Sequence, residues 1–97
     1  MTEQTPNPIV EHDSAAQRFL LQKDGHTAVL QYTLQNNVIT FTHTGVPAEL
    51  EGRGLGSQLA RVGLEYARAN KFKVVSLCWF VSGYIDRHTE YQNLLKT

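Results

Sequence analysis

The sequence predicts an α+β fold, in which an antiparallel β-meander is followed by a helix-strand-helix unit. Short turn signals separate three strand-like stretches in the first half, and apolar side chains recur at helical spacing in the second half. A chain of 97 residues has room for one hydrophobic core. We therefore expect one domain over residues 16–97, preceded by a mobile leader over residues 1–15, which lack both hydrophobic periods.

The meander is predicted from two turns and the strands on either side of them. An Asp-Gly pair at 24–25 supplies the positive φ of a tight hairpin and joins a strand over 18–22 to an alternating strand over 27–35. Two asparagines at 36–37 tolerate left-handed backbone and lead into a β-branched strand over 38–44. Consecutive strands joined by such short turns pair antiparallel.

The second half begins with an amphipathic helix, which we expect over residues 54–69 with Asn70 as its end. Its inner face is predicted to consist of Leu55, Leu59, Val62, Gly63, Tyr66 and Ala67. A short apolar run over 73–79 predicts a buried strand, which would lie parallel to the third strand after a right-handed crossover. The tail over 81–95 is expected to form one or two short helices.

A glycine-rich loop, Glu-Gly-Arg-Gly-Leu-Gly-Ser-Gln at 51–58, leads into this helix. Glycines let the backbone approach a ligand, and the free amides and positive dipole of a first helical turn suit a phosphate or pyrophosphate. Arg53 would add a charged donor. Taken alone, the loop fits a tight strand-to-helix connection equally well. A dinucleotide-binding loop needs a further glycine at wider spacing than Gly56 provides, and a P-loop needs a lysine before Ser57.

The glycines of this loop resemble those of the GCN5-related N-acetyltransferase family, whose motif is Gln or Arg, two residues, Gly, one residue, then Gly or Ala. The one departure is Glu51, which stands where that family has Gln or Arg. The chain looks like the very small, single-domain branch of the family, and the residues that resemble it are Thr42-His43-Thr44-Gly45-Val46-Pro47, Gly52-Arg53-Gly54-Leu55-Gly56-Ser57, Cys78 and His88-Thr89-Glu90-Tyr91. The resemblance covers most of residues 17–96 and implies a minimal GNAT-like acyl-CoA-binding fold.

The resemblance implies that acetyl-CoA is the cosubstrate and that an amine, either small or an exposed lysine, accepts the acetyl group. It places the coenzyme A pyrophosphate on backbone amides of Arg53, Gly54, Leu55, Gly56 and Ser57. It pairs the pantetheine arm with the strand end at Thr44, Gly45 and Val46. The alternatives are a non-catalytic acyl-CoA-binding or sensing module, and an interaction domain that docks a partner through Trp79, Phe80 and Tyr84.

Cys78 and His43 are candidates for the chemistry. Strand alternation puts His43 on the face of Ile39 and Phe41, close to where the strand containing Cys78 should lie. A histidine beside a cysteine stabilises the thiolate, so transfer through an acetyl-Cys78 intermediate competes with direct attack by the amine. The alternative for Cys78 is core packing, because free cysteine is among the most buried residues, and the alternative for His43 is a structural histidine.

Tyr84 and Tyr91 resemble the tyrosines that protonate the departing coenzyme A thiolate in many members of the family. Their alternative role is packing between helix and sheet. His88 and Glu90 would border the pocket or face water. The histidines and carboxylates do not follow the spacing of a metal site, so we expect no metal.

The composition argues against some partners and locations. Nine basic and nine acidic side chains give a net charge of zero, so the chain lacks the global field that attracts nucleic acid or an anionic membrane. One cysteine cannot form an internal disulfide, and no apolar run approaches the roughly 18 residues of a membrane span. These features predict a cytoplasmic protein without a nucleic-acid or membrane partner.

Overall fold

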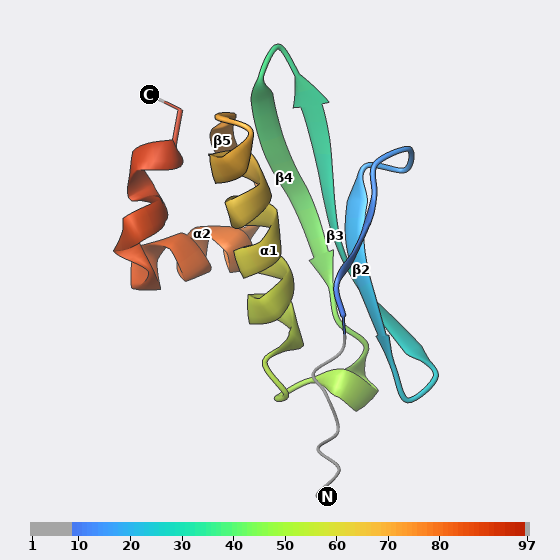
Figure 1. Ribbon diagram of the computed structural model, residues 1–97. Helices are drawn as coiled ribbons and strands as arrows, with labels where there is room; N and C mark the ends of the chain where they lie inside the picture. The colour runs from blue at the N-terminus through green and yellow to red at the C-terminus, as the bar shows by residue number, and fades with distance from the viewer. Residues whose placement is uncertain (1–8, 97) are drawn as a thin grey trace, which may run out of the picture.

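The computed structural model describes residues 9–96 and shows a five-stranded sheet in the order β1-β2-β3-β4-β5. Figure 1 shows the helices together along one side of this sheet, with α1 beside β4. The elements are β1 (Glu11–Asp13), β2 (Arg18–Lys23), β3 (His26–Gln35), β4 (Val38–Gly45), α1 (Leu55–Ala69), β5 (Lys73–Ser76), α2 (Trp79–Arg87) and the short 3-10 turns η1 (Ala48–Leu50) and η2 (Thr89–Leu94). The predicted α+β fold, a meander followed by a helix-strand-helix unit, is confirmed.

The meander forms where its turn residues predict it. Strands β2, β3 and β4 pair antiparallel, and β5 pairs parallel with β4. The turns have the left-handed backbone expected from their sequence, with φ of 54° at Asp24, 78° at Gly25, 55° at Asn36 and 63° at Asn37. Local turn chemistry therefore sets the register of both hairpins.

Strand β1 corrects part of the predicted leader. Residues Glu11–Asp13 pair antiparallel with β2, where His12 stacks on Phe19 with ring centroids 4.2 Å apart. A hydrogen bond of 2.6 Å also joins His12 Nε2 to the Tyr32 hydroxyl. Three residues are too few for a hydrophobic period to show, so the sequence pattern did not indicate this strand. Residues 1–8 of the predicted leader lie outside the described residues.

Helix α1 lies closely against the sheet because of a glycine in its middle. A Cβ atom at Gly63 would lie 2.9 Å from Phe41 Cε1 and 3.0 Å from Leu30 Cδ2, so only glycine lets the backbone approach β3 and β4 this closely. The predicted bounds are confirmed within one residue, with Gly54 and Asn70 as the caps. The buried residues of the helix are Leu55, Gly56, Leu59, Ala60, Gly63, Leu64 and Ala67.

The predicted strand over 73–79 is wrong in its second half. Strand β5 ends at Ser76, and α2 begins at Trp79 rather than at residue 81. The side chains of Leu77 and Trp79 are 71% and 84% exposed, so the apolar run is not a uniformly buried strand. A short apolar run has no period that separates a strand from the start of a helix.

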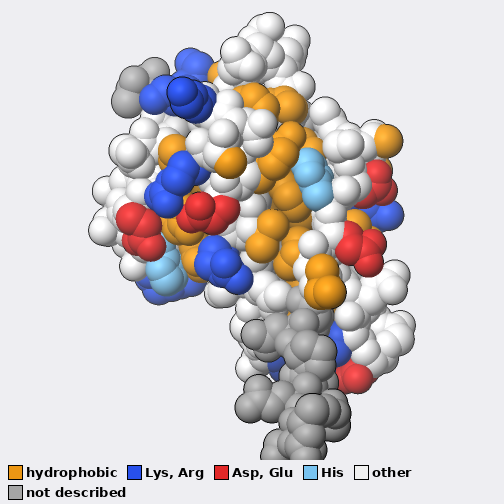
Figure 2. Space-filling view, in the orientation of Figure 1, with side chains coloured by type: hydrophobic (Ala, Val, Ile, Leu, Met, Phe, Trp, Pro, Cys, Tyr) orange, Lys and Arg blue, Asp and Glu red, His pale blue; other side chains and the backbone are white. Residues whose placement is uncertain are grey.

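The surface mixes apolar and charged side chains. On the face shown in Figure 2, hydrophobic side chains form a band, and Lys or Arg and Asp or Glu side chains lie on both sides of it. Within residues 9–96, no helix has both the length and the apolar character needed to cross a membrane.

Candidate functional site

A β-bulge in β4 decides which side chains reach the site. Gln31 pairs with His43 while Tyr32 pairs with Phe41, so Thr42 is an extra residue without its own partner in β3. The side-chain alternation therefore reverses after Phe41. His43 lies on the outer face with Gln31 and is exposed, so the prediction that it shares a face with Ile39 and Phe41 is wrong.

Thr44 takes the inward position instead. It pairs with Leu30, a fully buried residue on the sheet face that α1 covers, and directly opposed residues share a face. The Thr44 hydroxyl lies 3.1 Å from the Cys78 sulfur, within hydrogen-bonding distance. The structure thus places Thr44, and not His43, beside the thiol.

Strands β4 and β5 separate just beyond the bulge. Their parallel pairing ends at Phe41 and Ser76, and the last bond runs from the Leu77 amide to the Phe41 carbonyl at 2.9 Å. Strand β4 continues to Gly45, whereas the other chain turns into α2. Within the part of the chain that the structure describes, the end of β4 has no strand partner on this side.

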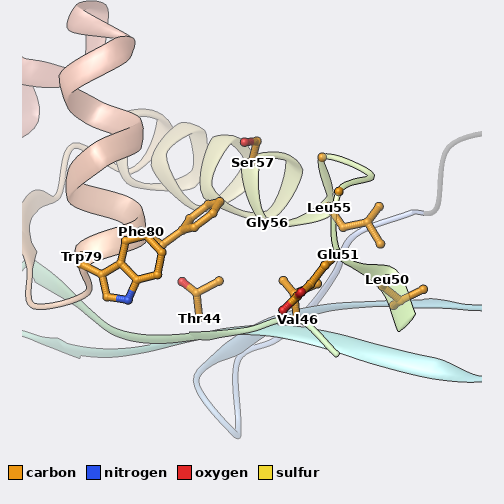
Figure 3. A pocket seen from close by; sticks show the side chains of 11 residues that line it. Thr44, Val46, Leu50, Glu51, Leu55, Gly56, Ser57, Trp79 and Phe80 are labelled. Atoms are coloured by element: carbon orange, nitrogen blue, oxygen red, sulfur yellow. The ribbon is translucent and has the colours of Figure 1, made fainter. Parts of the chain in front are cut away.

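A pocket of about 410 Å³ lies where the two strands separate (Figure 3). The end of β4, the glycine loop, the first turn of α1 and the first turn of α2 all contribute to it. Its lining residues are Thr44, Val46, Leu50, Glu51, Gly52, Gly54, Leu55, Gly56, Ser57, Trp79 and Phe80. Most of the predicted cofactor-binding residues therefore meet in one pocket, while Gly45 and Arg53 are not among its lining residues.

The first turn of α1 presents backbone amides at this pocket. Gly54 caps the helix with a left-handed φ of 74°, and the Gln58 amide makes the first bond back to the Gly54 carbonyl at 3.1 Å. The amides of Leu55, Gly56 and Ser57 precede that bond, so they have no carbonyl partner within the helix. Among residues 9–96, no side chain makes a capping hydrogen bond at this helix end. The arrangement suits an anionic group.

Gly56 has a packing role as well. A Cβ atom there would lie 2.6 Å from Phe80 Cζ, so glycine allows the Phe80 ring of α2 to pack directly on α1. Gly56 therefore serves the contact between α1 and α2, and it also lines the pocket.

Cys78 lies behind the pocket wall. It is the extended residue before α2, its side chain is 7% exposed, and its carbonyl accepts a hydrogen bond of 3.0 Å from the Ser76 hydroxyl. It is not a lining residue itself, but its neighbour Thr44 is. The Thr44 side chain therefore lies between the Cys78 thiol and the pocket.

The two predicted catalytic tyrosines lie outside this pocket. The Tyr91 hydroxyl donates a 2.6 Å hydrogen bond to Glu65, and the Arg68 guanidinium lies 4.8 Å from the centre of its ring. Burial, together with this hydrogen bond, raises the pKa of Tyr91 to about 12. Tyr84 is buried and stacks on His88 with centroids 4.0 Å apart, and burial raises its pKa too. The contacts of Tyr91 join η2 to α1, which is a packing role.

A model of the family described as GCN5-related N-acetyl-transferase matches residues 18–94. The chain belongs to the GCN5-related N-acetyltransferase family. Proteins named NATD1 from chicken and human are each 30% identical to this member over 82 residues, covering 81% of this chain and 74% and 73% of theirs. The solution structure of a GCN5-like protein from Staphylococcus aureus aligns with a TM-score of 0.72 and 28% identity, covering 91% of this chain and 87% of that one.

Sequence reasoning about this GCN5-related chain missed two features of the site. Trp79 and Phe80 line the pocket, whereas the sequence presented them only as candidates for docking a partner. Glu51 also lines it, and the signal was present, because Glu51 occupies a motif position next to the glycines.

Proposed function

We propose that this protein is an acetyl-CoA-dependent N-acetyltransferase that transfers an acetyl group to an amine, either a small amine or an exposed lysine. The observation that supports this most is the split between β4 and β5, which opens onto the first turn of α1. An extended ligand with amide groups adds to an unpaired strand edge, and a pyrophosphate suits a glycine-lined helix N-terminus. Coenzyme A carries both groups on one chain, in that order.

In this proposal the pantetheine arm follows the end of β4, at Thr44, Gly45 and Val46. The pyrophosphate lies on the amides of the first turn of α1. Gly52 and Gly54 have φ of 82° and 74°, and a Cβ atom at either would meet nothing within 4 Å, so these glycines serve the backbone turn and leave the amides accessible. Coenzyme A then contacts both the end of β4 and the first turn of α1.

The chemistry requires an amine nitrogen to attack the thioester carbonyl carbon. A carbon–nitrogen bond forms, the carbon–sulfur bond breaks, the nitrogen loses a proton, and coenzyme A leaves as a thiolate that takes up a proton. A group near the pocket must accept the amine proton. The one carboxylate among the described lining residues, Glu51, belongs to the loop that leads to the pyrophosphate position, so in this proposal water beside the thioester accepts the amine proton.

Direct attack is favoured over an acetyl-Cys78 intermediate. In the covalent route the Cys78 sulfur would displace coenzyme A and then pass the acetyl group to the amine, which requires a deprotonated thiol. The group in contact with the thiol is the Thr44 hydroxyl at 3.1 Å, a much weaker base than an imidazole. His43, the predicted partner, lies on the outer face.

The first experiment is a titration with acetyl-CoA, followed by the fluorescence of Trp79. Trp79 is the single tryptophan of the chain and lies at the pocket, so its emission reports on ligand binding there. We expect saturable binding of acetyl-CoA and, with a panel of amines, an acetylated product in the mass spectrum. Absence of binding at roughly millimolar ligand would refute the assignment.

Two variants separate the routes. Cys78→Ala should retain turnover if the amine attacks directly, while loss of turnover with intact acetyl-CoA binding would favour the covalent route. Ser82→Ala is a matched control, because Ser82 lies on α2 and bonds Ser76 at 2.7 Å, so it tests whether loosening this turn alone changes turnover.

The second candidate function is a non-catalytic acyl-CoA-binding or sensing module. It is supported by the positions of His43 on the outer face and of Tyr91 on Glu65, which leave the pocket with few titratable groups. Saturable binding without transfer to any amine of the panel would favour this function over the enzyme.

A further inference from the structure

A second hollow shares two residues with the pocket at the strand split. It has a volume of about 350 Å³ and is lined by Arg53, Gly54, Ser57, Gln58, Arg61, Tyr84 and His88. Gly54 and Ser57 line both cavities. The first turn of α1 therefore forms a rim with a cavity on each side.

The two cavities differ in charge. Among the described residues that line the pocket, the one charged side chain is the carboxylate of Glu51, whereas the hollow is lined by two arginines and a histidine without any described carboxylate. Arg61 makes no ion pair with any residue in 9–96. Arg53 is bound to Asp24 at 2.8 Å, which holds it at the loop and lowers the pKa of that carboxyl group.

Asp24 offsets the charge of Arg53, whereas no carboxylate within residues 9–96 pairs with Arg61. Glu65, one turn beyond Arg61 on α1, accepts hydrogen bonds from the Tyr91 hydroxyl at 2.6 Å and from Arg68 at 3.2 Å. Arg68 also donates to the backbone carbonyl of Glu90 at 3.0 Å. The Glu65 carboxylate is thus engaged with Tyr91 and Arg68, and the guanidinium of Arg61 remains available to a ligand.

We propose that this hollow binds the 3′-phosphate of coenzyme A, so that the protein selects coenzyme A over dephospho-coenzyme A. The inference rests on the proposed function, which places the pyrophosphate on the shared rim. In coenzyme A, the pantetheine arm is attached to one end of the pyrophosphate and the phosphorylated ribose to the other end. With the pyrophosphate on the rim, the pantetheine arm enters the pocket and the ribose phosphate enters the hollow. A phosphate monoester carries more than one negative charge at neutral pH and is well matched to guanidinium donors.

The test compares the affinities of coenzyme A and dephospho-coenzyme A by calorimetry. A charge-assisted contact gives an expected preference for coenzyme A of about tenfold in the native protein. Arg61→Gln should reduce this preference to near unity while leaving the affinity for dephospho-coenzyme A unchanged. Lys73→Gln removes the same charge from β5, outside both cavities, and should keep the preference.

The outcomes separate the two proposals. Failure of both ligands to bind would overturn the proposed function. Equal affinity of the native protein for both ligands, or a preference that survives Arg61→Gln, would overturn the phosphate site while leaving the proposed function intact. An equal loss of preference in Lys73→Gln would show that net charge alone causes it, which also contradicts the site.

Discussion

Replacing Gly63 by alanine should destabilise the fold, because the added methyl group has nowhere to go. Its Cβ would lie 2.9 Å from Phe41 Cε1 and 3.0 Å from Leu30 Cδ2, and both of these side chains are fully buried. Overpacking of this kind costs about 1–3 kcal/mol. Alanine gains about 1 kcal/mol over glycine inside a helix. Because both neighbours are fully buried, we take the upper end of the overpacking cost, about 3 kcal/mol, which less the helix gain of about 1 kcal/mol leaves a net loss of about 2 kcal/mol.

Gly83→Ala is the matched control, with the opposite sign. Gly83 is also inside a helix, but the nearest atom to its added Cβ is Arg87 Nη1 at 3.4 Å, the free end of a flexible side chain. We expect it to stabilise the protein by up to about 1 kcal/mol through helix propensity. Denaturant unfolding measures both changes as midpoint shifts at constant m-value.

The size of the thermal effect follows from the size of the domain. For a chain of this length, 1 kcal/mol shifts the melting temperature by about 4–8 °C, so Gly63→Ala should lower it by roughly 8–16 °C. Equal stabilities for the Gly63 and Gly83 variants would refute the claim that close packing of α1 on β3 and β4 requires a glycine. The helix would then have room to shift.

Three further predictions concern the site and the tail. Gly56→Ala should weaken acetyl-CoA binding measured by calorimetry, because its Cβ would lie 2.6 Å from Phe80 Cζ and displace a ring that lines the pocket; unchanged affinity would contradict this. Glu51→Gln should strengthen acetyl-CoA binding at low salt, by removing a negative charge near the pyrophosphate, and this gain should shrink at high salt; an unchanged affinity at low salt contradicts the placement of the pyrophosphate. Folding raises the pKa of Tyr91 from its ordinary value near 10 to about 12, so its stabilising contribution is present below the lower value and is lost as pH rises through the upper one; a tyrosinate absorbance titration should lose this late phase in Tyr91→Phe.

Local chemistry was sufficient to predict the meander and the long helix. The turn residues at 24–25 and 36–37 prefer left-handed backbone whatever surrounds them, and α1 has an apolar stripe over several turns. These signals depend on the residues themselves. They placed every strand of the meander and both ends of α1 within about two residues.

The bulge in β4 could not be predicted in this way. Thr42 is an extra residue only in comparison with β3, because it has no opposite residue in that strand. The alternation of apolar and polar side chains within β4 alone does not reveal how β4 pairs with β3. The prediction of a strand over the whole of residues 73–79 was wrong for a similar reason. Where β5 ends is decided by its separation from β4 after Phe41, which is a tertiary event.

The bulge in β4 and the early end of β5, the two features that the sequence did not predict, lie at the same place in the structure, and the candidate site lies there too. The bulge turns Thr44 inward and His43 outward, and the early end of β5 leaves the edge of β4 open and brings Trp79 and Phe80 to the pocket. A regular sheet would pair this edge and fill the space with side chains. A backbone edge that can accept a ligand therefore requires a break in the pattern, so irregular segments in such a small domain are the places to search for function.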